Sequence, residues 1–443
     1  MAADSGGVTT KPYGAWTSPV SAASLAEGAI GLAELRVAGG RIYWLESRPA
    51  EGGRMVAMTR DGGGVRQLTP ERFNVRTRVH EYGGGSYVVA PDGLWFSHFR
   101  DQKLYRQAGD AAPEPMTPEG YRYADAEALP GGGLVAVRED HTDPAHVRNT
   151  VVRLSGRSGD SGAVLFGDSD FVAYPRLSPD GARLCWIAWD FPAMPWDATR
   201  LYVAELTSSG LANVRQVAGG DDISVIDPQW AADGTLTWIS DETGWWNLYD
   251  DRGGKPRALR PETAEIGGPL WQLGQSNYAA VAGDRILASV GEAGGDRLWL
   301  LDRTGGPVRK LDLPFVGYAA LHAVDGARVA MIAGSAAETA AVIVVDVDTG
   351  GYDLVARPSP THLDPRYISM AEPVSFPSAN GRTAHALYYP PRNDDVRAPA
   401  GETPPLIVQA HGGPTGAASG AFSLSTQFWT SRGFAVVDGD YGG

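Results

Sequence analysis

The residues best placed to do chemistry are His411-Gly412-Gly413-Pro414, which follow the apolar run LIVQA at residues 406–410. A glycine turn at the end of a strand presents backbone N–H groups and lets a substrate approach the main chain. Such N–H groups stabilise the negative charge that develops on a carbonyl oxygen during acyl transfer. We therefore predict that His411, Gly412 and Gly413 form the oxyanion and substrate-binding side of an acyl-transfer site. The alternative interpretation is a strand-end histidine that bonds only to backbone.

The nucleophile of such a site has no candidate motif. A Gly-x-Ser-x-Gly sequence does not occur in the 443 residues, and the acid and the histidine base normally follow that motif in the chain. His411 precedes any such nucleophile, so we interpret it as a wall of the site and not as a general base. We assign no catalytic triad residue, and we expect a large accessory domain followed by only the opening of a catalytic domain.

The elements around the glycine turn predict a parallel sheet with a crossover helix. Residues 406–410 have the unalternating apolar pattern of a strand buried on both faces. Residues 422–432 carry apolar side chains at mixed helical spacing, and residues 434–437 form a second β-rich run. Upstream, residues 371–391 predict a hairpin that turns at Asn380-Gly381.

A second candidate lies far upstream in His80-Glu81-Tyr82, before a triple glycine at residues 83–85. The carboxylate of Glu81 could pair with the free amino group of a peptide, as a charge-assisted contact. The alternative is a structural turn whose glycines take positive φ. The sequence favours this alternative, because carboxylates are common beside turns.

A repeat dominates residues 33–361. Seven blocks of short strands and turns begin near residues 41, 93, 134, 183, 235, 285 and 328, roughly 40 to 52 residues apart. Asp-Gly turns introduce the clearest blocks, LSPDGARL (177–184) and WAADGTL (230–236). This period predicts a seven-bladed β-propeller with four strands per blade, preceded by an arm at residues 1–32 and followed by the start of the catalytic domain at residues 362–443. A β-sandwich is the alternative, but sandwiches do not repeat at this period.

Composition and motifs limit the partners, cofactors and cellular location that we expect. The net charge is −14, which argues against nucleic acid and anionic membranes as partners, since both need a basic face. The single cysteine, Cys185, permits no intrachain disulfide; we predict a buried side chain and a cytoplasmic location. No signal peptide and no apolar run of about 18 residues is present. Nucleotide-binding motifs are missing, and His141 and His146 read as a polar loop, so we expect neither cofactor nor metal.

Several segments together resemble the prolyl oligopeptidase family of serine peptidases, in the branch of acylaminoacyl-peptidases and dipeptidyl peptidases. They are TRVHEYGGGSY (77–87), WIAWDFPAMPWDATRLYVAEL (186–206), DPQWAADGTLTWISDETGWWNLY (227–249), EPVSFPSANGRTAHALYYPP (372–391) and QAHGGPTG (409–416). The resemblance implies a mainly β fold, in which a seven-bladed propeller caps an α/β-hydrolase domain. It also implies a Ser-Asp-His triad and short peptides as substrates, with the propeller restricting access.

Two predictions remain open alternatives at this point. The first is a serine peptidase whose triad is absent from these 443 residues, so that this chain alone is inactive. The second is a propeller that binds a partner and keeps a vestige of a hydrolase domain. The tryptophans at residues 186, 189, 196, 245, 246, 271 and 299 are expected mostly to pack within and between blades.

Overall fold

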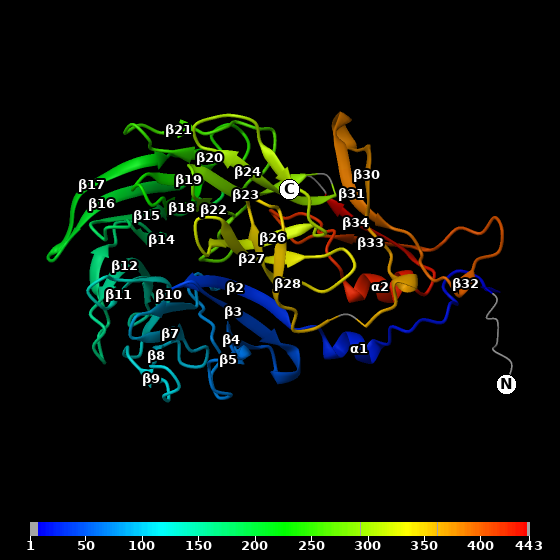
Figure 1. Ribbon diagram of the computed structural model, residues 1–443, viewed down its shortest axis with the longest axis horizontal. Coiled ribbons are helices and arrows are strands. Elements are labelled where there is room, and N and C mark those ends of the chain that lie inside the picture. The colour runs from blue at the N-terminus through cyan, green and yellow to red at the C-terminus, as the bar shows by residue number, and fades with distance from the viewer. Residues whose placement is uncertain (1–7, 293, 361, 441–443) are drawn as a thin grey trace.

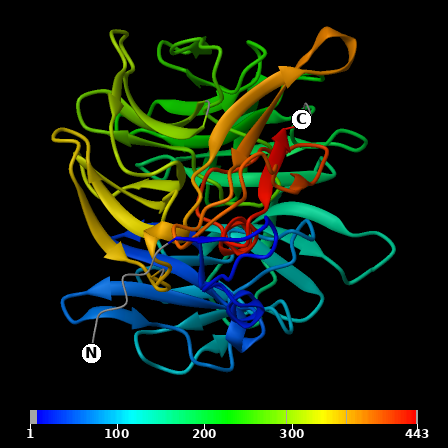
Figure 2. The same cartoon turned by 90° about the vertical axis from the view of Figure 1, so that its right-hand side faces the viewer.

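Seven four-stranded antiparallel sheets follow one another along the chain and stand in a ring (Figures 1 and 2). The computed structural model describes residues 8–292, 294–360 and 362–440. The first strands of successive blades contact one another, with β18 and β22 joined by the hydrogen bond from the Tyr278 hydroxyl to the carbonyl of Asp227, and β26 contacts β2 to close the ring. The predicted seven-bladed propeller is therefore confirmed, and each predicted block begins at or within one residue of the second strand of a blade.

The first four blades are formed by the following strands. Blade 1 has β2 (Gly31–Ala38), β3 (Arg41–Arg48), β4 (Arg54–Asp61) and β5 (Gly64–Gln67). Blade 2 has β6 (Tyr87–Ala90), β7 (Gly93–Ser97), β8 (Leu104–Gln107) and β9 (Glu114–Pro115). Blade 3 has β10 (Tyr121–Ala128), β11 (Leu134–Asp140), β12 (Arg148–Leu154) and β13 (Ala163–Phe166). Blade 4 has β14 (Phe171–Leu177), β15 (Arg183–Trp189), β16 (Arg200–Thr207) and β17 (Gly210–Gly219).

The last three blades complete the ring. Blade 5 has β18 (Val225–Trp230), β19 (Leu236–Ser240), β20 (Asn247–Asp250) and β21 (Arg257–Ala258). Blade 6 has β22 (Tyr278–Val281), β23 (Arg285–Glu292), β24 (Gly295–Asp302) and β25 (Arg309–Leu311). Blade 7 has β26 (Gly317–Ala323), β27 (Arg328–Gly334), β28 (Ala341–Asp346) and β29 (Tyr352–Ala356). A short 3-10 helix, η1 (Pro49–Glu51), lies within blade 1.

Large side chains on the second strands fill the blade interfaces. Trp44, Trp95, Trp186 and Trp238 lie on β3, β7, β15 and β19, and all four are buried. Cys185 is buried beside Trp186, as predicted. These residues bury the apolar face that a single twisted sheet would leave open to water.

Three of the first strands carry a carboxylate that forms a hydrogen bond with the next blade. In β2, β10 and β18 a β-bulge falls at an acidic residue with positive φ, namely Glu34 (47°), Asp125 (50°) and Asp227 (50°). Each carboxylate accepts a backbone N–H from the next blade: Ser86 at 2.6 Å, Tyr174 at 2.9 Å and Asn277 at 2.7 Å, respectively. A bulge re-aims a side chain, and here it directs three carboxylates across three blade junctions.

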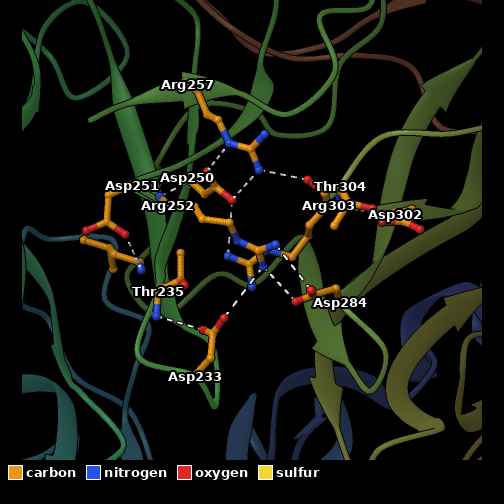
Figure 3. Close-up of polar contacts among 11 residues, drawn as sticks. Asp233, Thr235, Asp250, Asp251, Arg252, Arg257, Asp284, Asp302, Arg303 and Thr304 are labelled. Carbon is orange, nitrogen blue, oxygen red and sulfur yellow. Dashed lines mark hydrogen bonds and ion pairs between the residues drawn. The ribbon is translucent and has the colours of Figure 1, made fainter. Parts of the chain in front are cut away.

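A cluster of ion pairs joins blades 5 and 6 (Figure 3). Asp250, at the end of β20, is fully buried and accepts hydrogen bonds from Arg257 Nε at 2.8 Å and Arg303 Nη2 at 3.4 Å. Arg303 follows β24 and its side chain is also buried. At the exposed edge of the cluster, Arg252 pairs with Asp284 at 2.7 Å. Because each buried charge has an opposite partner, the cluster links the two blades without an uncompensated ion.

The chain that follows blade 7 forms a mixed sheet, which lies over one face of the ring (Figure 2). Its strand order is β30 (Glu372–Pro377), β31 (Thr383–Tyr389), β34 (Ala435–Asp440) and β33 (Leu406–Ala410). β33 and β34 are parallel and are joined through α2 (Leu424–Thr430). The predicted parallel pair, crossover helix and hairpin are thus present, with 3-10 helices η2 (Pro365–Tyr367) and η3 (Ala379–Gly381) in the connections.

One prediction for this sheet is wrong. Residues 406–410 were expected to be buried on both faces, yet Leu406 and Val408 are 55% and 69% exposed. Within the described residues β33 is an edge strand, which pairs only with β34 and packs mainly through Ile407. An apolar run without alternation predicts two covered faces, but it does not show which neighbours supply the cover.

The amino-terminal arm packs on this last sheet and its helix. β1 (Thr9–Thr10) pairs in parallel with β32 (Val396–Arg397). Arg432 Nη2 donates to the carbonyl of Val20 at 2.6 Å, and α1 (Ala22–Glu27) contacts α2. The two ends of the described chain therefore meet in the same region. The domain boundaries 1–32, 33–361 and 362–443 stay a prediction, and residues 1–7, 293, 361 and 441–443 within them lie outside the described part.

Candidate active site

The predicted oxyanion loop lies at the carboxyl end of β33. His411 follows the strand directly, and its Nδ1 donates to the carbonyl of Gly412 at 2.8 Å. A carbonyl only accepts, so this contact places the imidazole proton on Nδ1. A side chain added at Gly412 would meet nothing within 4 Å, so the main chain there is open to a ligand. The open backbone fits the predicted role of His411, Gly412 and Gly413, which stays a prediction.

Two contacts hold this loop from opposite sides. Asp440, at the end of β34, accepts the backbone N–H of Ala418 at 2.7 Å. On the propeller side, the indole Nε1 of Trp271 donates to Thr415 Oγ1 at 2.8 Å. Burial, together with the neighbouring Asp440 charge, raises the pKa of Asp438. The loop is therefore tied both to its own sheet and to the propeller.

A cavity of about 810 Å³ opens in the propeller beside Trp271. Its walls are mainly apolar and include several aromatic rings: the Trp271 ring packs on Trp196 at 4.4 Å and on Tyr82 at 5.1 Å between centroids. On another side Phe171 stacks on Trp189 at 5.3 Å. Aromatic walls with a few polar groups are typical of small-ligand sites.

Carboxylates line the remaining side of this cavity. Glu81 receives hydrogen bonds from Arg78 at 2.6 Å and Arg122 at 3.0 Å, which lower its pKa and keep it ionised. Glu139 is nearly buried; it accepts the backbone N–H of His80 at 2.7 Å and lies 2.8 Å from His141 Nε2. The acidic groups are held in place by cations, but the Glu81 side chain is still 62% exposed. Because the Glu81 carboxylate is exposed, a ligand ammonium can contact it without breaking a buried ion pair.

The structure shows how the two candidate segments are related. Glu81 precedes Tyr82, Tyr82 packs on Trp271, and Trp271 bonds to Thr415 in the loop after Gly413. The structural-turn interpretation also holds, because Gly83, Gly84 and Gly85 all have positive φ. The turn and the cavity wall are thus the same segment.

Sequence reasoning missed part of this cavity. The sequence predicts blade packing for most tryptophans, and Trp186 and Trp299 are buried as expected, but Trp189, Trp196 and Trp271 line the cavity. Glu139 was not singled out either. A local signal existed only for Trp196, which lies in a Pro-rich connection between strands rather than in a strand. Trp271 lies in a long connection whose partner, the 83–85 turn, is distant in sequence.

Only part of the histidine loop reaches the cavity: His141 lines it, whereas His146 does not. His141 bonds to Glu139, whereas His146 Nδ1 lies 2.9 Å from Asp143 in an exposed turn. Across residues 8–292, 294–360 and 362–440, no group of three His, Cys, Asp or Glu side chains could hold a metal ion. Among these residues, no helix is both long enough and apolar enough to cross a membrane.

A seven-bladed propeller placed against a mixed sheet, whose parallel pair β33 and β34 carries a His-Gly-Gly turn, defines a propeller-capped α/β-hydrolase. The chain matches no protein-family model and no curated protein. It is similar to a puromycin-hydrolyzing peptidase of Mycobacterium tuberculosis, with 36% identity, a TM-score of 0.91, and coverage of 98% of this chain and 70% of that one. A puromycin hydrolase matches at 35% identity and a TM-score of 0.92, with the same coverage.

A more distant match is prolyl oligopeptidase B from Galerina marginata, with 12% identity, a TM-score of 0.70, and coverage of 94% of this chain and 62% of that one. That match shows a shared fold alone. The two matches at 36% and 35% identity confirm the resemblance drawn from the sequence. The chain belongs to the prolyl oligopeptidase family of serine peptidases.

Proposed function

We propose that this protein hydrolyses short peptides by acyl transfer, at a site between the propeller and the His-Gly-Gly loop. The observation that carries the proposal is the hydrogen bond from Trp271 to Thr415, because it sets the aromatic cavity directly beside the open backbone at Gly412. A peptide whose first side chain enters the cavity would bring its next carbonyl towards that backbone. Two solved relatives are named for hydrolysis of puromycin, and one was solved with a ligand called PGG, which supports peptide-like substrates.

The chemical roles follow from the contacts. The ionised Glu81 attracts the ammonium of a free amino terminus, and the aromatic walls desolvate the first side chain. Backbone N–H groups at Gly412 and Gly413 stabilise the oxyanion. The attacking serine and its acid and base are assigned to residues outside this chain, since no Gly-x-Ser-x-Gly motif occurs in it.

The test is an activity assay on the natural gene product that contains these residues. We expect it to release the amine from aminoacyl anilides and short peptides, and a serine-directed phosphonate to abolish that activity. The purified 443-residue chain should bind the peptides without cleaving them. Cleavage by this chain that depends on one of its own side chains would refute the assignment of the triad. Peptide binding without cleavage by any form would instead support the interpretation as a binding module.

A further inference from the structure

Two connections from opposite parts of the ring meet at the end of the propeller that faces the loop after β33. One runs from β5 to β6, into blade 2, and the other runs from β21 to β22, into blade 6. Blades 2 and 6 are not neighbours in the ring. Nevertheless, Gly84 and Leu273 form a parallel bridge, and the Leu273 N–H donates to the carbonyl of Gly83 at 2.9 Å. We call the crossing segments, residues 82–85 and 271–275, the septum.

The septum depends on glycine. Gly84 has a φ of 90°, and a Cβ there would lie 2.3 Å from the carbonyl oxygen of Leu273. A Cβ on Gly85 would lie 2.7 Å from the backbone of Asp125. Both distances are far below a van der Waals contact. The triple glycine therefore permits an approach of two main chains that no other residue type would allow.

The septum separates three cavities. Tyr82 and Leu273 line both the 810 Å³ cavity and a second cavity of about 700 Å³ beside blades 1 and 7. Gly274 and Gln275 line that second cavity and also a third, of about 490 Å³, which is lined by residues of first strands around the ring. Arg36 closes the junction by donating to the carbonyl of Gly274 at 3.2 Å. A ligand that enters the 810 Å³ cavity therefore meets a hydrogen-bonded wall. This wall lies between that cavity and the other two.

The cavity has its exposed rim elsewhere. Phe191 is 79% exposed and Met194 is 43% exposed, and both line the 810 Å³ cavity. A sphere of 810 Å³ is about 12 Å across, which holds about three extended residues at ~3.4 Å each. The space is thus bounded in depth and is entered from the side of blade 4.

We propose that the septum limits the substrate to the amino end of a peptide, because it stops the chain from continuing through the propeller. This inference rests on the proposed function, which places the amino terminus beside Glu81. Residues added before that terminus have no channel to occupy, whereas residues added at the carboxyl end extend away from the cavity. The septum residues are positioning residues and take no part in the bond-breaking step.

The experiment measures peptide binding by calorimetry on this chain. The probes are acetyl-Phe-Ala-Ala-amide and two series with one to four alanines, inserted between the acetyl group and Phe or added at the carboxyl end. The acetyl group prevents an extended probe from binding by a new free amino terminus, so Phe remains the side chain that fills the aromatic cavity. Three added residues at the amino end should weaken binding more than tenfold, and three at the carboxyl end less than threefold. Gly84→Ala should lose this difference. Gly109→Ala is the matched control, since Gly109 also has positive φ (57°) but has nothing within 4 Å.

The outcomes separate this inference from the proposed function. Equal binding of both series to the unsubstituted chain overturns the septum's role, whether or not Gly84→Ala folds, and so does a failure of every probe to bind. A retained length limit in a folded Gly84→Ala chain, judged by circular dichroism, overturns it as well. A length limit in binding, together with no hydrolysis by the natural gene product, would leave the septum standing and refute the peptidase proposal.

Discussion

The indole Nε1 of Trp271 donates a 2.8 Å hydrogen bond to Thr415 Oγ1, across 144 residues of sequence. Trp271 belongs to the connection between blades 5 and 6, and Thr415 belongs to the loop after β33. Because Trp271 also packs on Trp196 and Tyr82, the loop is fixed relative to the wall of the cavity. The propeller thus helps to position the candidate oxyanion backbone, beyond enclosing it.

Replacing Thr415 by valine should loosen the loop. The change keeps the branched shape but removes the acceptor, and a single neutral hydrogen bond contributes about 1 kcal/mol. We expect amide exchange across residues 411–418 to rise severalfold, with little change in the melting temperature. Hydrogen exchange read by mass spectrometry measures this. Thr383→Val, at an exposed position of β31, is the control and should leave the loop unchanged. Unaltered exchange in Thr415→Val would mean that the loop is ordered without the propeller.

Glu81→Gln tests the recognition of the substrate's amino group. The substitution removes the charge but keeps the size, so KM for peptides with a free amino terminus should rise about tenfold in the natural gene product. KM for the N-acetylated peptides should stay the same. Glu119→Gln is a suitable control, because Glu119 is also an exposed, cation-paired glutamate, with Lys103 at 3.0 Å. An unchanged KM for the free-amine peptides would remove Glu81 from the site.

The sequence predicted those parts of the fold whose signals are local. Asp-Gly turns and apolar second strands recur at short range, so the seven blades could be counted without coordinates. The bulges could not be predicted, because Glu34, Asp125 and Asp227 adopt positive φ without being glycine. Their conformation is stabilised by backbone N–H donors on a neighbouring blade, which is a tertiary effect.

The same contrast between local signals and tertiary contacts applies to the candidate site. His411, Gly412 and Gly413 could be predicted as site residues because a strand followed by His-Gly-Gly is a contiguous pattern, and their role stays a prediction. The role of Trp271 depends on its contacts with Thr415 and Tyr82, and no spacing in the sequence links these residues to it. Burial on both faces of residues 406–410 failed as a prediction for a related reason, since the cover of a strand is supplied by other segments.

The carboxylate of Asp227 predicts an unusual dependence of stability on pH. Burial raises its pKa to about 6, well above the value near 3.8 expected in an unfolded chain. The folded state therefore binds this proton more tightly, and the stability contributed by the group falls as the pH rises from about 4 to about 6. The shift corresponds to about 3 kcal/mol. Burial also raises the pKa of Glu34 and Glu127, so these groups act in the same direction.

Asp227→Asn should flatten this profile. Thermal melts between pH 4 and pH 8 measure the slope, and the substituted chain should lose less stability across that range than the unsubstituted chain. Asp302→Asn is the control with the opposite sign, because hydrogen bonds from Thr304 lower the pKa of Asp302. That group stabilises the fold above its unfolded pKa and loses its contribution as the pH falls. An unchanged slope in Asp227→Asn would show that Asp227 is not the titrating group.

Asp250→Asn should be among the most damaging single changes in the propeller, although it lies far from the site. Asp250 is fully buried and bonds to Arg257 and Arg303, and the Arg303 side chain is only 2% exposed (Figure 3). Neutralising Asp250 leaves Arg303 buried without its counter-charge, and breaking one partner of a buried ion pair costs about 3–5 kcal/mol. Asp284→Asn in the same cluster breaks only an exposed pair with Arg252, which contributes about 0–1 kcal/mol. Melting temperatures of the two variants should therefore differ clearly, with Asp250→Asn the lower. Equal melting temperatures would mean that water reaches Arg303 and that the junction of blades 5 and 6 does not depend on this charge.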